Sequence, residues 1–303
     1  MEMDLAPFVG GLFDEIIVAF VVTPSWVIVG LIWLVRLFKE GSVMSFTLTL
    51  QVWSRVALDS ILIMGICGTS LGIMGMIYNS EFTSTSVDYL YESVKISLLT
   101  FAWGGLFTGL AFVIRDKKQN IHFHINSLGL SLTLLTTLAL ILWQCFESRV
   151  PLSYFFLEPN FLKMYAAIFF VCLLACIGKT SNKSLLEVAV DSNITATLGG
   201  IALGVCLWFV EGGNYDNSRD AIFLVANFLF VGSIIYLLLY FVALHVDQTD
   251  RSDWQTKTWH FAEAASFFIF LIYAPVGATE YLRESTDQAN QQANNEAQEL
   301  RIE

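Results

Sequence analysis

Acidic side chains beside long apolar segments are the residues of this sequence best suited to chemistry in a membrane. Asp59, Asp191 and Glu263 each lie near an end of an apolar block. Asp59 and Asp191 are expected in the first turns of their helices, where the helix N-terminus favours negative charge. An ionised group at the bilayer centre costs at least about 2.5 kcal/mol, and no acidic residue of the sequence falls there. The sequence therefore does not predict a self-contained proton relay.

The four histidines are the next candidate group. All of them are expected at the inner face of the membrane, where a cluster could bind a metal ion or sense pH. Separate, hydrated histidines are the simpler interpretation, and we favour it. The four are His122, His124, His245 and His260, of which the last shares a helical face with Glu263.

The cysteines and the familiar catalytic motifs give no sign of an enzyme. No two cysteines form a Cys-x-x-Cys pair, and all lie within or at the ends of apolar blocks, so we expect small buried hydrophobic residues. The sequence has no nucleotide-binding loop, no Ser-His-Asp set and no paired catalytic carboxylates. The residues do not identify a cofactor, so whether one is bound stays unknown. The cysteines are Cys67, Cys145, Cys172, Cys176 and Cys206.

Glycines recur at helical spacing in three of the apolar blocks. Steps of three and four residues place them on one helical face, where the missing side chains let a second helix approach closely. Helix packing is the general interpretation of such motifs. The sequence predicts helix–helix contacts at Gly65, Gly68, Gly72 and Gly75, at Gly105 and Gly109, and at Gly200 and Gly204.

The elements that must position these residues are long apolar helices. Of the 303 residues, 55% are hydrophobic and 14% are charged, with a mean hydropathy of +0.63, whereas a soluble domain carries roughly 25% charge. A net charge of −11 speaks against a basic surface for nucleic acid. About 20 apolar residues suffice to cross a bilayer as a helix. We predict an all-α polytopic membrane helix bundle in contact with lipid, with about eight transmembrane helices at 16–35, 57–78, 96–114, 123–145, 161–178, 193–210, 221–245 and 260–279.

Two of these segments are short and flanked by polar residues, namely 161–178 and 260–279. A count of seven spans is therefore the alternative. The distribution of Lys and Arg predicts the orientation: with the N-terminus outside, the inner side carries ten of them and the outer side six. The first residues are acidic and lack the basic start of a secretory signal peptide. We expect both termini on the external side.

An internal repeat relates the two halves of the chain. The sequence VALDS at Val56–Ser60 recurs as VAVDS at Val188–Ser192, an offset of 132 residues. The same offset places two glycines of the second apolar block on two glycines of the sixth. Four helices in each half would give the halves one orientation, which makes a parallel repeat about an axis along the membrane normal.

The predicted organisation follows from this repeat and from a change of composition near the C-terminus. We expect a first four-helix membrane repeat at 1–150 and a second at 151–280. The segment 281–303 is polar, rich in amides and acidic. We expect it to be a solvated external tail, with a short partner-binding helix as the alternative.

Two neighbouring helices carry sequence motifs in a characteristic order. The first reads GTSLGI from Gly68, and the second, which returns across the membrane, reads SLLTFAWGG from Ser97. A looser copy of the first motif, GGIALG, begins at Gly199. The stretch from Gly65 to Phe112 thereby resembles the MotA/TolQ/ExbB proton-channel family, whose members have a GTxxG helix, a short outer loop and a returning threonine-bearing helix.

The resemblance implies a subunit of a multi-protein complex in a bacterial inner membrane. In that family, channel subunits surround a single-span partner that supplies the proton-binding Asp. Thr69 and Thr100 match threonines that line the shared interior, and Phe101 stands where the family has a second threonine. The resemblance thus predicts that Thr69 and Thr100 face one interior. The alternative is that each hydroxyl bonds the carbonyl four residues earlier in its own helix.

Three functions are compatible with these features. The first is a membrane-complex subunit built on a MotA/TolQ/ExbB-like core and linked to the proton-motive force through a partner's carboxylate. The second is a small transporter or channel with its site between two repeats. The third is a structural membrane scaffold whose glycine faces serve assembly. We favour the first, because a partner would supply the carboxylate that the apolar helices of this chain lack.

The predicted orientation can be tested by labelling single cysteines from outside in a chain without its native cysteines. A cysteine at position 285 should react with an impermeant maleimide in intact cells, whereas one at position 117 should react only after the membrane is opened. Labelling of position 117 but not of position 285 would contradict the predicted orientation.

Overall fold

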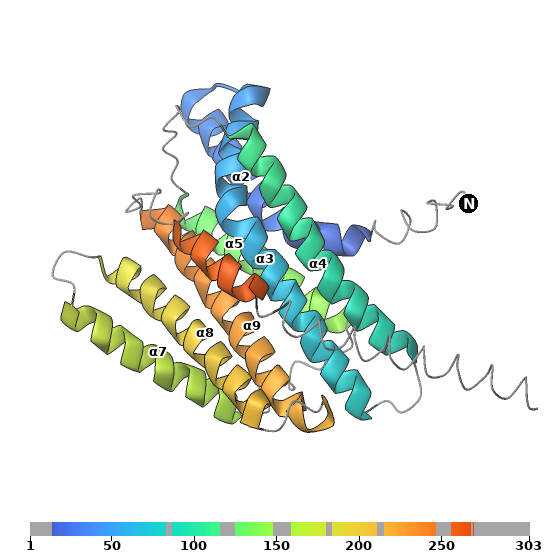
Figure 1. The fold of residues 1–303 in the computed structure, drawn as a ribbon. Coiled ribbons are helices and arrows are strands. Elements are labelled where there is room, and N and C mark those ends of the chain that lie inside the picture. Colours follow the sequence, from blue (N-terminus) through green and yellow to red (C-terminus); the bar gives the residue numbers. More distant parts are fainter. Residues whose placement is uncertain are drawn as a thin grey trace, which may run out of the picture. The chain divides into compact units, whose positions relative to one another are not determined.

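The chain folds into helices throughout the residues that the structure describes. This computed structural model describes residues 14–82, 87–115, 125–147, 159–179, 184–210, 215–246, 256–267 and 269. The helices are α2 (Glu15–Glu40), α3 (Phe46–Phe82), α4 (Val87–Ile114), α5 (Ser127–Glu147), α7 (Pro159–Lys179), α8 (Leu185–Val210) and α9 (Tyr215–Val246), followed by a helix over 256–267 (Figure 1). The all-α prediction is confirmed.

Six of these helices are long and apolar enough to cross a membrane, which is consistent with an integral multi-pass membrane protein. They are α2, α3, α4, α5, α8 and α9. The apolar stretch of α7, Leu162–Ala175, is shorter than the 20 or so residues that a span requires. The predicted segment 260–279 extends past the described residues. The seventh and eighth spans therefore stay predictions.

Two helices, α3 and α8, begin earlier than their apolar blocks, and this corrects the expected position of two acidic residues. α3 begins at Phe46 and α8 at Leu185, so Asp59 and Asp191 do not lie in first turns. At the start of α8, the Ser184 N–H donates to the Glu187 carboxylate and the Glu187 N–H donates to the Ser184 hydroxyl. This reciprocal capping box starts the helix in a polar stretch that hydropathy alone does not mark.

α3 is the central helix of the bundle. Its apolar stretch is completely buried, and it packs against α4, α9, α2 and α5. A second group forms where α8 packs between α7 and α9, and these three run side by side in Figure 1. The contact of α3 with α9 joins the two groups.

The contacts divide the chain into two compact units, Met1–Ala262 and Glu263–Glu303. Both predicted repeats fall mostly within the first unit. The predicted tail, 281–303, lies outside the described residues.

Asp14 holds the beginning of α2 in two ways. Its carboxylate accepts hydrogen bonds from the backbone N–H groups of Ile16 and Ile17, which makes it the N-cap of the helix. The same carboxylate pairs with the Lys95 ammonium of α4 at 2.8 Å. Burial by itself raises the pKa of Asp14, but the bond and charge of Lys95 and the two N–H donors outweigh it, so the pKa is lowered.

This lowered pKa makes the contribution of Asp14 dependent on pH. The stabilisation is fully present above the ordinary carboxyl pKa of 3.8 and is lost as the pH falls through the lower folded-state value. Asp14→Asn, which keeps a capping oxygen, should lose only the ion pair, about 0.2–1 kcal/mol. Asp14→Ala should lose about 1 kcal/mol more. The free energy of unfolding in detergent at pH 7 and pH 3 measures the loss for each variant. If the loss caused by Asp14→Asn is the same at pH 3 as at pH 7, this role of Asp14 is contradicted.

Candidate functional site

α3 and α4 cross so closely that their backbones touch. A Cβ atom built on Gly65 would lie 3.0 Å from the Thr100 carbonyl oxygen and 3.1 Å from the Cα of Gly104. One built on Gly72 would lie 2.5 Å from the Cβ of Ser97. Any side chain at these two glycines would push the helices apart, so this crossing requires glycine.

A third helix joins the contact at Gly68. A Cβ there would lie 2.6 Å from the Thr100 methyl group and 2.9 Å from the Phe20 ring of α2. Gly75, further along α3, is buried. The glycine face of α3 therefore lies inside the bundle, where α2 and α4 meet.

The glycine of α4 that meets this face is Gly104, and the expectation for Gly105 and Gly109 is not met. No atom lies within 4 Å of a Cβ built on Gly105 or Gly109, and both residues are exposed. One residue along a helix turns the side-chain direction by about 100°. The face that contacts α3 consists of Ser97, Thr100 and Gly104, and Gly105 lies beside it.

Two hydroxyl groups bond the α3 and α4 backbones to each other. The Thr69 hydroxyl lies 2.8 Å from the Gly65 carbonyl oxygen and 3.1 Å from the Ser97 carbonyl oxygen, so that its proton is shared. The Ser97 hydroxyl donates in return to the Thr69 carbonyl at 3.0 Å. The Thr100 hydroxyl lies 3.4 Å from that of Thr69 and donates to the Ile96 carbonyl at 2.7 Å.

The structure thus brings Thr69 and Thr100 together, and both are completely buried. Each also bonds the carbonyl four residues earlier in its own helix, as the alternative interpretation expected. Ser97 was missed as a site residue, although its spacing from Thr100 and Gly104 marks one helical face. These residues have no ionisable group among them, and they form a closed polar contact in an apolar bundle.

α8 and α9 cross in a related way. The Phe228 ring occupies the space beside Gly200, and a Cβ built on Gly204 would lie 2.5 Å from the Val225 side chain. The Thr197 side chain fills the space beside Gly232. Gly200 and Gly204 therefore lie at a helix contact, as their spacing predicts.

A polar network that sequence reasoning missed fixes α7 to this second crossing. Asn193, completely buried, accepts a hydrogen bond from the Tyr165 hydroxyl of α7 and donates to the Gly232 carbonyl of α9 at 3.0 Å. The Thr197 hydroxyl donates to the Asn193 carbonyl at 2.8 Å. A buried asparagine in an apolar helix was the available signal, since such a side chain needs partners.

The two crossings keep the register of the sequence repeat. Adding 132 to positions 65 and 100, which touch in the first crossing, gives Thr197 and Gly232, which touch in the second. Adding 132 to 72 and 93 gives Gly204 and Val225, again a contact in both crossings. The same hydrogen bond also recurs, from Ser60 to the Val56 carbonyl and from Ser192 to the Val188 carbonyl.

The acidic candidates lie apart from the crossings. Asp191 pairs with the buried ammonium of Lys257 at 3.0 Å, a partner that the sequence did not predict. Asp59 is 4% exposed. Glu263 begins the second compact unit.

The histidines show no metal site within the residues that the structure describes. His245 lies with its Nδ1 2.7 Å from the Ile125 carbonyl oxygen, where it links the end of α9 to the start of α5. His122 and His124 lie outside the described ranges, and His260 lies in the helix over 256–267.

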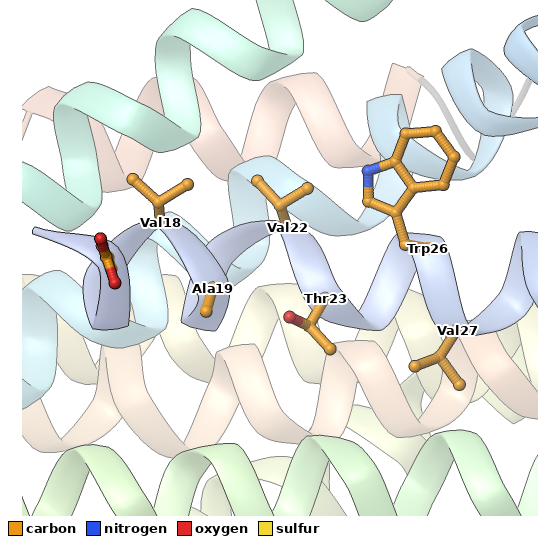
Figure 2. A pocket seen from close by; sticks show the side chains of 7 residues that line it. Val18, Ala19, Val22, Thr23, Trp26 and Val27 are labelled. Carbon is orange, nitrogen blue, oxygen red and sulfur yellow. The ribbon is translucent and has the colours of Figure 1, made fainter. Parts of the chain in front are cut away.

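An apolar groove runs along α2. Figure 2 shows Val18, Val22 and Trp26 along one edge of the helix and Ala19 and Val27 along the other. The Trp26 ring stacks on that of Trp53 in α3, with centroids 5.6 Å apart. The remaining lining residues are Glu15 and Thr23. Such a mostly apolar wall suits lipid chains.

No family model matches this sequence, and no curated protein or solved structure matches it.

The crossing predicts a sharp contrast between two glycines. Gly72→Leu should prevent stable folding or cost more than about 3 kcal/mol, because the side chain would overlap Ser97. Gly30→Leu, at a glycine of α2 with no atom within 4 Å of its Cβ, should fold normally. Folded yield and melting temperature in detergent measure the difference. Equal yields for the two variants would contradict the close crossing.

Proposed function

We propose that this chain is an integral membrane subunit of a larger membrane complex, with the α3–α4 crossing as its rigid core. The observation that carries the proposal is the exposed glycine pair of α4. Gly105 and Gly109 are exposed, and no atom of the residues that the structure describes lies within 4 Å of a Cβ built on either of them. In a membrane, small residues at an open helix face are typical of contacts with another helix, since packing rather than the hydrophobic effect drives association there.

The proposal keeps the resemblance to MotA/TolQ/ExbB proteins as its starting point and changes the expected role of the threonines. Thr69 and Thr100 are buried against each other and bond backbone carbonyls. A partner's carboxylate therefore has no access to them within this chain. If the complex conducts protons, the proton path would lie between this chain and its partner, beside the α3–α4 crossing and not through it. Eight spans, two parallel repeats and a bacterial inner membrane belong to this same proposal.

One observation favours a small transporter as the second candidate function. Within the described residues, the side-chain amide of Gln144 in α5 and the Asn227 side-chain oxygen in α9 are buried without a hydrogen-bond partner. Buried polar atoms in hydrocarbon are costly, and such groups often mark the path of water or a polar solute. α5 and α9 are in contact, as a site between the halves would require.

Purification of the chain from its native membrane after mild cross-linking tests the proposal. A single-span membrane protein should co-purify, and the reconstituted complex should be assayed for proton flux. Thr69→Val should lower the recovery of the complex, since lost interhelical bonds loosen the core by about 0.6 kcal/mol each. Thr136→Val is the matched control, because the hydroxyl of this half-buried threonine bonds the Leu132 carbonyl of its own helix and, within the described residues, no other helix.

A chain that purifies alone, with equal yields of both variants and no flux, would overturn the proposal. If Gln144→Leu or Asn227→Leu then abolishes solute uptake by vesicles that contain the chain alone, the transporter becomes the better description. Full uptake by both leucine variants would remove that candidate.

A further inference from the structure

The contact between α3 and α9 joins the two halves of the chain in a head-to-tail manner. In the repeat register, α8 corresponds to α3, and α9 corresponds to α4. The halves therefore meet through the first crossing helix of one and the second crossing helix of the other. In the described residues, α4 and α8 make no comparable contact. A head-to-tail interface joins two different surfaces, here one on α3 and one on α9. The surface of the first half that matches α9 and the surface of the second half that matches α3 therefore take no part in it.

The unused surface of the first half lies on α4. Ala102, Gly105 and Gly109 are exposed along one face, flanked by Leu98 and Phe112. Their counterparts on α9 are large and lie inside the bundle: Phe230, Leu237, Phe241 and Leu244 are buried, and Ile234 is half-buried. The positions that are buried on α9 are thus exposed on α4, and small residues occupy the centre of this exposed face of α4.

The unused surface of the second half lies on α8. Its exposed residues include Thr195, Ala202, Leu203, Cys206 and Leu207. The counterparts of these residues on α3 are all buried, namely Ile63, Ser70, Leu71, Met74 and Gly75. Matching positions are therefore buried on α3 and exposed on α8.

We propose that α4 of one chain packs against α8 of a second copy of the same chain, repeating between copies the contact that α9 makes with α3 within one. This inference rests on the proposed function, because it names a partner for the open face of that membrane subunit. Continuity with the internal interface selects a second copy as the occupant. The small residues on both faces let two backbones approach closely in lipid.

The contact register also fixes which residues of the two copies should meet. Position 65 touches Gly104 in the first crossing and corresponds to Thr197 in the second. If the two repeats share one depth in the membrane, Gly105 of one copy lies level with the segment near Thr195 of the next. By the same register, Leu98 lies level with Leu203.

Cysteine cross-linking between two differently tagged copies tests this contact. One copy carries Gly105→Cys and the other Thr195→Cys, both in a chain whose native cysteines are replaced, and oxidation is performed in the native membrane. We expect a covalent dimer of the two tags and no dimer of Gly105→Cys with itself, because the contact is head-to-tail. Leu98→Cys with Leu203→Cys should behave in the same way. Leu135→Cys, on the exposed side of α5, is the control and should not react.

A chain with both cysteines should form a ladder of covalent multimers, since each copy then has both halves of the contact. A matched pair of leucine variants supplies a second measurement. Gly105→Leu should reduce the cross-linked yield of the Leu98 and Leu203 pair about tenfold, by overfilling the close contact. Gly30→Leu, whose glycine also has nothing within 4 Å, should leave the yield unchanged.

Dimers of Gly105→Cys with itself, or equal yields for the two leucine variants, would overturn the proposal. So would the absence of both expected dimers from membranes in which the cysteine variants are folded. The experiments distinguish a failure of this contact from a failure of the proposed function. If the chain cross-links to a second copy and to no other protein, only the single-span partner is rejected. A chain that binds another protein but never itself removes the second copy only.

Discussion

The contact of two helix backbones at the α3–α4 crossing is the constraint on which the rest of the bundle depends. α3 is buried along its whole apolar stretch, so its neighbours must approach it without gaps. At Gly65, Gly68 and Gly72 they approach to the distance at which a Cβ would collide. In lipid, helix association depends on such close packing and on satisfied polar groups. Both are met here by glycine and by short hydroxyl side chains.

The hydroxyl groups at this crossing are all hydrogen-bonded within the bundle. Thr69 and Ser97 each bond a carbonyl of the other's helix, and Thr100 bonds within α4. The second crossing has the same register with different chemistry: Phe228 packs over Gly200, and Asn193 carries the polar contacts. The two crossings thus bring matching positions into contact, while the side chains that stabilise them differ.

Two ion pairs fix neighbouring elements of the bundle to one another. Asp14 caps α2 and pairs with Lys95 of α4, and Asp191 of α8 pairs with Lys257. Partly buried pairs of this kind stabilise when both partners are kept, because a single charge left behind is costly. The two helix crossings depend on hydroxyl and amide contacts instead.

Of the eight spans that the sequence predicts, six correspond to helices that are long and apolar enough to cross a membrane. The sequence by itself determined that the chain is helical and apolar enough for a multi-pass membrane protein, and which helices carry glycine faces. These follow from hydropathy and from spacings of three and four, which local geometry fixes. Only the tertiary structure decided that Gly104 and not Gly105 meets α3, that Asp191 pairs with Lys257, and that Asn193 bonds Tyr165. The physical reason is that periodicity defines a helical face to within one residue. The partner of that face depends on how distant helices pack, and no local pattern encodes their packing.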